Sequence, residues 1–246
     1  MDTNNYILFI LEGKKTEPQI IDGLKRNFFK NNIIIEAIYG TVIYHLYSKL
    51  YIDGVLDEDL DFFQILKENV KGIPKNLNRE NVSEIYLFFD HDGHATNASN
   101  KKIEQMLKYF NNETENGKLY INYPMVESLK HIGKFSVNEM KAKIDNNRKY
   151  KNRVSKESLP KYIHIKHYNY RDWSFLVKHH NKRLGYTINK KFKPLWRYIS
   201  QLEIFDNQRK KYILKNKEVF ILSAFPIFLI DHFGYKRFYS KPNRRK

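Results

Sequence analysis

Two aspartates separated by one residue, Asp90 and Asp92, stand directly before Gly93 and are the first candidates for chemistry in this sequence. Two carboxylates this close repel each other unless a cation or a proton lies between them. Carboxylate oxygens on a loop are ligands that suit Mg²⁺ or Mn²⁺. For an isolated motif of this kind, an Asp-Gly turn that merely ends a strand is the alternative interpretation.

A second acidic position, Glu12, has the same sequence context. It is followed by Gly13, which permits a tight turn. Residues 6–11 before it and residues 85–89 before the aspartates are continuous apolar runs, as expected of strands buried on both faces. Ligands bind beyond the carboxyl ends of the strands in an open α/β sheet, so we expect Glu12 and the two aspartates to converge. Three carboxylates would hold a divalent cation that takes phosphate oxygens as its remaining ligands.

Other polar residues near these strand ends are candidates for supporting roles. Glu127 follows an apolar run over residues 119–123, and it is either a further ligand or a helix N-terminal residue favoured by the helix dipole. Lys14, or the lysine after it, could neutralise charge that develops on a phosphate during the reaction. His91 and His94 could orient a water or protonate a leaving oxygen, although loop histidines commonly only face solvent.

The elements that must position these residues follow an alternating pattern. Apolar runs and amphipathic segments alternate in residues 1–129 and predict an α/β fold with a mostly parallel four-stranded sheet flanked by helices. The strands are expected over residues 6–13, 33–38, 84–89 and 119–123. The helices are expected over residues 17–29, 42–50, 62–70 and 101–110, with an acidic loop over 53–61 that caps the third helix.

Residues 130–246 have a different composition and are expected to form a second, basic and mainly helical domain. Residues 1–129 carry 14 basic and 19 acidic side chains, whereas residues 130–246 carry 30 and 8, so the net charges are −5 and +22. This segregation indicates that the second half holds a polyanion, and a solvated basic surface is the alternative. Helices are expected over 135–148, 173–184 (ended by Gly185), 195–205 and 219–233, with a polar loop over 146–158.

Basic and aromatic residues interleave between residues 168 and 197. Aromatic faces stack bases and cations hold phosphates, which is how single-stranded nucleic acid is commonly bound. Trp173 and Trp196 are nevertheless better explained as helix core residues. The candidate nucleic-acid contacts are Arg171, Lys190, Lys191, Lys193 and Arg197.

Composition excludes several classes of protein. The sequence has no cysteine, which excludes disulfides and thiolate zinc sites. The longest apolar stretch, residues 219–230, contains a proline and is shorter than the about 20 residues that a membrane span needs. Residues 6–11 are too short for the apolar core of a signal peptide. We therefore expect a cytoplasmic protein that does not enter membranes.

The ordered acidic motifs resemble the Toprim domain, which is shared by topoisomerases, primases and the overcoming-lysogenisation-defect (OLD) nucleases. Glu12-Gly13 follows the first predicted strand, and Asp90-His-Asp92 follows a later one. The extended form Glu12-Gly-Lys-Lys-Thr-Glu17 resembles the OLD-like and small phage-defence branches. Gly40 falls where such proteins often carry a glycine after the second strand. The resemblance covers about residues 5–129.

The resemblance implies a Mg²⁺- or Mn²⁺-dependent nuclease that cuts RNA or DNA. Glu12 would be a metal ligand or general base beside Asp90 and Asp92, and Glu17 and Glu127 would complete a second site. Stand-alone proteins of this type are similar to the effector nuclease of the PARIS phage-defence system. That similarity implies a toxic activity, tRNA as a substrate, and an ABC- or AAA-type ATPase partner, with a homodimer as a further assembly. The chain has no phosphate-binding loop of the form Gly-x-x-x-x-Gly-Lys-Ser/Thr, so the ATPase would be another polypeptide.

Three rival functions remain open at this stage. A haloacid-dehalogenase-like phosphatase also places a nucleophilic aspartate in an apolar DxDG context, but that family usually has threonine after the glycine, where this chain has His94. A topoisomerase or primase would need a tyrosine domain or zinc features that we do not identify. A non-catalytic nucleic-acid-binding subunit would use the basic half alone.

Overall fold

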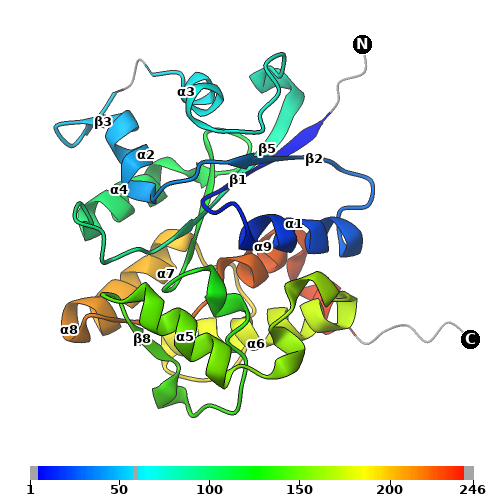
Figure 1. Ribbon diagram of the computed structural model, residues 1–246, viewed down its shortest axis with the longest axis vertical. Helices are drawn as coiled ribbons and strands as arrows, with labels where there is room; N and C mark the ends of the chain where they lie inside the picture. Colours follow the sequence, from blue (N-terminus) through cyan, green and yellow to red (C-terminus); the bar gives the residue numbers. More distant parts are fainter. Residues whose placement is uncertain (1–4, 58–59, 241–246) are drawn as a thin grey trace, which may run out of the picture.

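The computed structural model describes residues 5–57 and 60–240 and has an α/β fold (Figure 1). Its main sheet has five strands in the order β2-β1-β5-β7-β6, and all neighbours are parallel except β6, which is antiparallel to β7. The strands are β1 (Tyr6–Leu11), β2 (Ile33–Ile38), β5 (Val82–Asp90), β6 (Asn111–Asn112) and β7 (Gly117–Asn122). Four of them lie where the sequence predicts strands. The fifth, β6, consists of two asparagines and has no apolar pattern from which to predict it.

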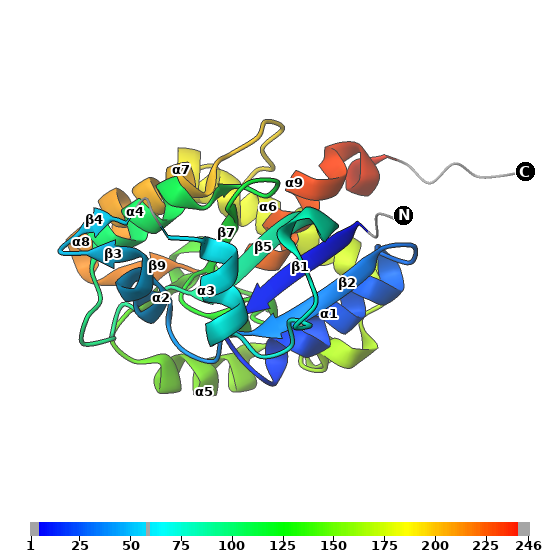
Figure 2. The same cartoon turned by 90° about the horizontal axis from the view of Figure 1, so that it is seen from above.

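Helices cover both faces of the sheet because alternate strand residues point to opposite sides. On one face, Phe9 and Phe88 belong to a cluster that includes α1 (Thr16–Asn27), α6 (Tyr170–Asn189) and α9 (Ala224–Tyr239). On the other face, strand residues such as Ile10 and Leu87 pack with four helices, and the two helical layers are visible in Figure 1 and, from above, in Figure 2. These four helices are α2 (Ile43–Leu50), α3 (Phe62–Asn69), α4 (Asn100–Tyr109) and α7 (Gln201–Gln208).

The predicted helices of the first half are confirmed to within two residues at each end. Asp61 caps α3 as expected, since its carboxylate accepts hydrogen bonds from the backbone N–H groups of Phe63 and Gln64. The segment predicted as an acidic loop begins with a small hairpin of β3 (Tyr51–Ile52) and β4 (Val55–Leu56). Residues 58 and 59 of that loop lie outside the described ranges.

The helix predicted over residues 135–148 is wrong. Residues 137–139 form one 3₁₀ turn, η3, and β8 (Lys141–Lys143) then pairs antiparallel with β9 (Glu218–Phe220). The pairing partner lies more than 70 residues along the chain, so the local pattern contains no signal for it. The polar loop predicted over 146–158 is also wrong, because α5 (Asn147–Glu157) occupies it. Asn146 caps this helix by accepting from the N–H of Lys149.

Gly185 does not end α6, which continues to Asn189. A Cβ on Gly185 would lie 1.9 Å from the carbonyl oxygen of Lys193, so the glycine allows the following loop to pack against the helix. Asn169 is the N-cap residue of α6, and Asp172 pairs with it in a capping box.

The last two predicted helices start later than expected. Ser200 caps α7, so residues 195–199 are not helical. The apolar run over 219–233 divides into β9 and α9, and Gly234 interrupts α9 with φ +74 rather than ending it. Elsewhere in the described residues, the short elements are η1 (Arg79–Asn81), η2 (Val126–Leu129), η4 (Pro160–Tyr162), η5 (Ile165–His167), a π-helical turn η6 (Arg209–Ile213) and α8 (Leu214–Asn216).

The two halves of the chain share their hydrophobic core. Phe225 of α9 stacks on Phe88 with ring centroids 4.3 Å apart, and Phe228 packs edge-on against Phe9 at 5.5 Å. Both core clusters contain residues from before and after residue 129, and the domain boundary there stays a prediction. In the described part of the chain, no helix combines the length and the apolar character needed to cross a lipid bilayer.

Candidate functional site

The carboxyl ends of β1 and β5 bring Glu12 to the two aspartates. The strands are parallel neighbours, with Leu11 opposite Phe88. The backbone N–H of Glu12 continues this pairing by donating to the Phe88 carbonyl over 3.2 Å. Its side chain turns toward β5, where Oε2 accepts a hydrogen bond of 2.9 Å from the backbone N–H of Asp90. The convergence expected from the sequence is therefore present.

The two aspartates are buried and each accepts a hydrogen bond from an asparagine. Asp90 ends β5, and its Oδ1 accepts from Asn122 Nδ2 over 3.2 Å. Asp92 lies in the left-handed region with φ +42, a conformation that aspartate tolerates better than most residues. Its Oδ1 accepts from Asn147 Nδ2, at the start of α5, over 2.7 Å. The motif therefore does more than end the strand, because hydrogen bonds hold both of its carboxylates in position.

Glu17 lies in the first turn of α1 and is tied back to the Glu12 turn. Its Oε1 accepts from the backbone N–H of Gly13 over 3.0 Å. A Cβ on Gly13 would lie 2.6 Å from both oxygens of this carboxylate, so a larger residue there would displace the Glu17 side chain from its present position. Gly40, with φ +80, donates its N–H to the Glu12 carbonyl over 3.0 Å and closes the turn from the β2 side.

Glu127 approaches from the third strand of the group. It lies in the 3₁₀ turn η2 that follows β7, and it is buried. Its Oε1 is 3.7 Å from the Lys151 ammonium, and its Oε2 has no hydrogen-bond partner within the described ranges. The side chain belongs to a helical first turn, as one interpretation of the sequence expects, and lies near the other acids, while its role as a metal ligand stays a prediction.

The five acidic residues form one electrostatic unit, which we call the carboxylate cluster: Glu12, Glu17, Asp90, Asp92 and Glu127. Burial raises the pKa of Glu12 to about 9, and the nearby Asp92 carboxylate adds to the shift. Burial also raises the pKa of Asp90, followed by repulsion from the other four members. The pKa of Glu17 is raised by burial and by Glu127. Protons or a cation must therefore compensate the charge of the cluster.

The cluster has the donor chemistry that a divalent cation requires, but its side chains are held by the protein. Two aspartate oxygens accept from asparagine amides, and Lys151 is the one lysine or arginine that pairs with a cluster member in residues 5–57 and 60–240. In the same ranges, no three acidic or histidine side chains are arranged so that they could hold a metal ion as they stand. The unpaired Glu127 oxygen and the raised pKa values fit a cation, whose binding would require the side chains to change their positions.

Sequence reasoning missed three residues that contact the cluster: Asn122, Asn147 and Lys151. Asn122 carried a usable signal, because it ends the apolar run of β7 just as Asp90 ends that of β5. Asn147 and Lys151 carried none, because they lie in a segment predicted as a loop and reach the cluster through tertiary packing alone.

The histidines and Lys14 lie in different environments. His91 is buried, which corrects the expectation of a solvent-facing side chain, and burial lowers its pKa to about 4. Its backbone N–H donates to the carbonyls of Asn122 and Pro124, and these bonds hold the residue at its buried position. His94 stays exposed, 3.8 Å from Asp92. Lys14 is also exposed and forms no ion pair with any described carboxylate.

The predicted nucleic-acid contacts are distributed over a separate part of the C-terminal half. Arg171, Lys191 and Lys193 are exposed. Arg197 is occupied by two hydrogen bonds to the Glu203 carboxylate, and the Lys190 ammonium donates to the Tyr212 hydroxyl over 2.7 Å.

The two tryptophans differ from each other. Trp173 is fully buried, as expected of a helix core residue. Trp196 is 62% exposed and lies in the loop before α7, where its ring contacts Tyr235 and Tyr239, so its assignment to a helix core is wrong. Comparisons of this chain with protein-family models, with curated proteins and with solved structures found no match.

Proposed function

We propose that this chain is a metal-dependent phosphodiesterase of the Toprim type that cleaves nucleic acid. The observation that supports it most is the meeting of Glu12 with Asp90 and Asp92 at the ends of two adjacent parallel strands. Ligand sites of open α/β sheets lie at this edge. Burial and then repulsion between the carboxylates raise the pKa values of Glu12 and Asp90, and a divalent cation would offset both effects.

Asp90, Asp92 and Glu12 would hold a Mg²⁺ or Mn²⁺ ion, and Glu17 and Glu127 would serve a second one. When bound, such an ion polarises the phosphate and lowers the pKa of a coordinated water. The chain supplies the orientation of its ligands through asparagine hydrogen bonds and through the short turn after β1.

Proton transfer and charge stabilisation are assigned to residues beside these ligands. Glu12 is either a ligand of the ion or the general base that accepts a proton from an attacking water, and its place at the end of β1 suits both roles. Lys151, next to Glu127, and the exposed Lys14 are the cations that would stabilise charge on the phosphate.

The test is divalent-dependent cleavage of RNA or DNA by the purified chain. We expect Asp90→Asn and Glu12→Gln each to lower the rate at least about a hundredfold, the loss typical when one charge-stabilising group is removed from a site. Asp22→Asn, at an exposed position of α1, is the matched control and should cleave like wild type. Normal cleavage by either cluster variant, with folding checked by circular dichroism, would contradict the assignment.

The resemblance extends the proposal to biology. The nuclease would be a toxic effector in anti-phage defence, with tRNA among its substrates and an ATPase partner that holds it inactive. Expression of the chain alone should then arrest growth, whereas Asp90→Asn should not. Growth arrest that persists in Asp90→Asn would exclude the nuclease as its cause.

A non-catalytic nucleic-acid-binding subunit is the second candidate. It is favoured by one observation, namely that one oxygen of each aspartate already accepts a hydrogen bond from an asparagine without a cation. Tight RNA binding without metal-dependent turnover would support it. A phosphatase of the haloacid-dehalogenase type remains a rival that trapping of a phospho-aspartate would reveal.

A further inference from the structure

A basic surface begins at the edge of the carboxylate cluster and follows α5. This helix carries five cationic residues and one acidic residue. At its start, Asn147 Nδ2 donates to Asp92, and one turn later Lys151 Nζ lies 3.7 Å from Glu127 Oε1. The two side chains are four residues apart and so lie on one stripe of the helix. This stripe forms a wall of the carboxylate cluster.

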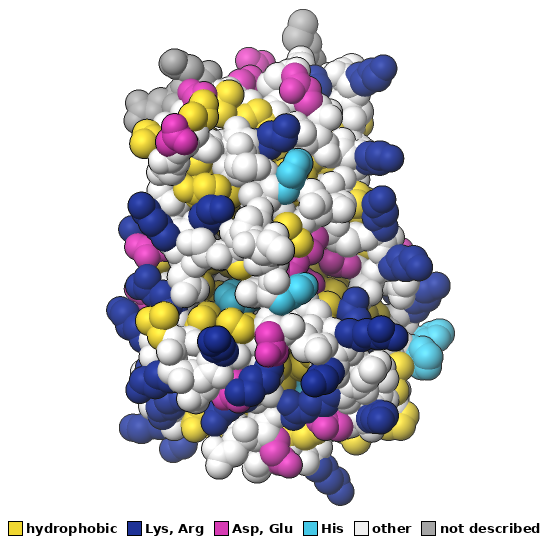
Figure 3. Space-filling view, turned by 60° about the vertical axis from the view of Figure 1, so that its left-hand side comes forward, with side chains coloured by type: hydrophobic (Ala, Val, Ile, Leu, Met, Phe, Trp, Pro, Cys, Tyr) yellow, Lys and Arg dark blue, Asp and Glu magenta, His cyan; other side chains and the backbone are white. Residues whose placement is uncertain are grey.

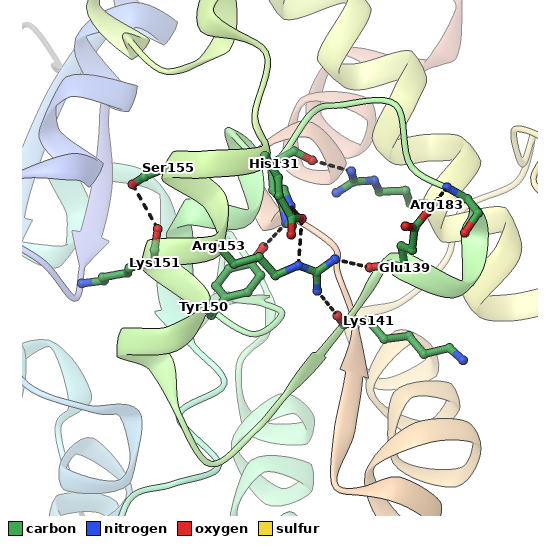
Figure 4. A network of polar contacts seen from close by, with 10 residues as sticks. His131, Glu139, Lys141, Tyr150, Lys151, Arg153, Ser155 and Arg183 are labelled. Carbon is green, nitrogen blue, oxygen red and sulfur yellow. Dashed lines mark hydrogen bonds and ion pairs between the residues drawn. The ribbon is translucent and has the colours of Figure 1, made fainter.

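Other side chains of α5 fix the helix to the body of the protein (Figure 4). Tyr150 is buried, and its hydroxyl lies 3.1 Å from His131 Nδ1. Arg153 donates to the carboxylate of Glu157 and to the backbone carbonyls of Glu139 and Lys141. Figure 4 shows the ammonium groups of Lys141 and Lys151 pointing away from this network. Lys141 and Lys151 therefore extend outward from a part of the protein that these contacts hold in place.

A hollow of about 410 Å³ lies between α5 and the two-stranded β8–β9 sheet. Its cationic lining residues are Lys141, Lys143, Lys149 and Arg153. Lys143 is paired with Glu218 at 3.2 Å, and Arg153 is occupied by the network described above. In contrast, the ammonium groups of Lys141 and Lys149 have neither an ion pair nor a hydrogen bond with any residue that the structure describes.

Further cations continue this surface beyond the β8–β9 sheet. The pKa of Lys190 is lowered by burial and then by the positive charges of Lys211, Lys141 and Lys215. These four lysines come from three separated segments of the chain, so the fold gathers like charges that repel one another. Figure 3 shows Lys and Arg side chains crowded over the lower half of the face in view. A polyanion compensates such a surface.

We propose that α5 and the two-stranded β8–β9 sheet bind the phosphodiester backbone of a nucleic acid and lead it into the carboxylate cluster, with Lys141 and Lys149 as phosphate contacts. This inference rests on the proposed function. It places the main contact surface next to the cluster and not at Arg171 or Arg197. With eleven residues and a rise of about 1.5 Å each, α5 is about 16 Å long. A duplex strand has one phosphate per about 3.4 Å, so the helix spans about four or five phosphates.

Binding of a fluorescently labelled RNA hairpin, measured by anisotropy in EDTA at several salt concentrations, tests this surface. We expect Lys141→Glu combined with Lys149→Glu to raise the Kd at least about tenfold and to reduce the salt slope by about two. The matched control is Lys30→Glu combined with Lys236→Glu, which changes the net charge equally at two exposed positions. Lys30 precedes β2 and Lys236 is in the last turn of α9, both away from the carboxyl ends of the strands. The control should change the Kd less than about twofold.

Two results would overturn the inference. One is equal weakening by both pairs, or none by the Lys141 and Lys149 pair, with folding of each variant checked by thermal unfolding. The other is wild-type protein that binds vesicles of anionic phospholipid but neither RNA nor DNA. Hydrolysis of bis(p-nitrophenyl) phosphate separates this inference from the proposed function, because so small a diester needs no extended surface. The variant with both lysines replaced should hydrolyse this small diester as wild type does. If wild type does not hydrolyse it, that result counts against the nuclease, and the RNA-binding measurement still decides on the surface.

Discussion

At the scale of single residues, the electrostatics of the carboxylate cluster depend on how many of its carboxyl groups are protonated. The pKa of Glu12 is raised to about 9 by burial and by Asp92, whereas an unfolded glutamate titrates near its ordinary value of 4.5. Between these two values the folded protein binds more protons than the unfolded chain. Linkage then requires the free energy of unfolding to fall as pH rises through this window.

We therefore predict that the metal-free protein loses about 1–2 kcal/mol of stability between about pH 7 and about pH 9. The window begins above the range in which the buried histidines titrate, since burial lowers the pKa of His91 and His131 to about 4. Urea unfolding in EDTA measures the effect, and Glu12→Gln should flatten it. On the proposed function, Mn²⁺ should stabilise wild type more at the higher pH, because a cation would bind the ionised form of the carboxylates. An equal pH slope in wild type and Glu12→Gln would mean that this residue is ionised normally.

At the scale of elements, local sequence rules fail where one segment packs against another. α6 continues through Gly185 because the loop after the helix packs against this position, with the Lys193 carbonyl 1.9 Å from the point where a Cβ would stand. The local sequence predicts that this glycine ends the helix, whereas its lack of a side chain allows the backbone of the following loop to pack against it. The sequence of α5 likewise predicts a loop, because its two buried apolar residues, Tyr150 and Val154, are surrounded by polar residues along the chain.

We predict that Gly185→Ala destabilises the protein by about 3 kcal/mol or more, because the new methyl group would collide with backbone that cannot move cheaply. Intrinsic helix propensity predicts the opposite sign, a gain of about 1 kcal/mol. The free energy of unfolding in urea distinguishes the two. Lys182→Ala, at an exposed position of the same helix, is the control and should change stability by less than about 0.5 kcal/mol. A stabilised Gly185→Ala variant would show that the loop does not pack as described.

At the scale of the whole molecule, the basic half of the chain completes the core of the acidic half. α9 covers one face of the sheet through Phe225 and Phe228, and α7 packs on the other face with α4. Without these helices, apolar side chains on both faces of β5 and β7 would be exposed to water. The charge asymmetry between the halves therefore does not require two independent folding units.

We predict that Phe228→Ala lowers the free energy of unfolding by about 3–5 kcal/mol, the cost of removing a fully buried aromatic side chain. Unfolding should remain a single transition when followed by circular dichroism and by the fluorescence of Trp173, which lies in the same cluster. Phe175→Ala, at a 42% exposed position, is the control and should cost much less. A transition in Phe228→Ala that splits into two steps would favour two independent domains.

The sequence by itself determined the parallel sheet, the helices of the first half and the convergence of Glu12 with Asp90 and Asp92. These features depend on local signals, because apolar runs mark buried strands and the residues that end parallel neighbours meet at one edge. Only the tertiary structure decided how the second half folds, that His91 is buried, and that Asn147 and Lys151 of α5 reach the carboxylate cluster. Those features depend on contacts between segments far apart in the chain, such as β8 with β9 and α5 with η2, for which a local pattern contains no information.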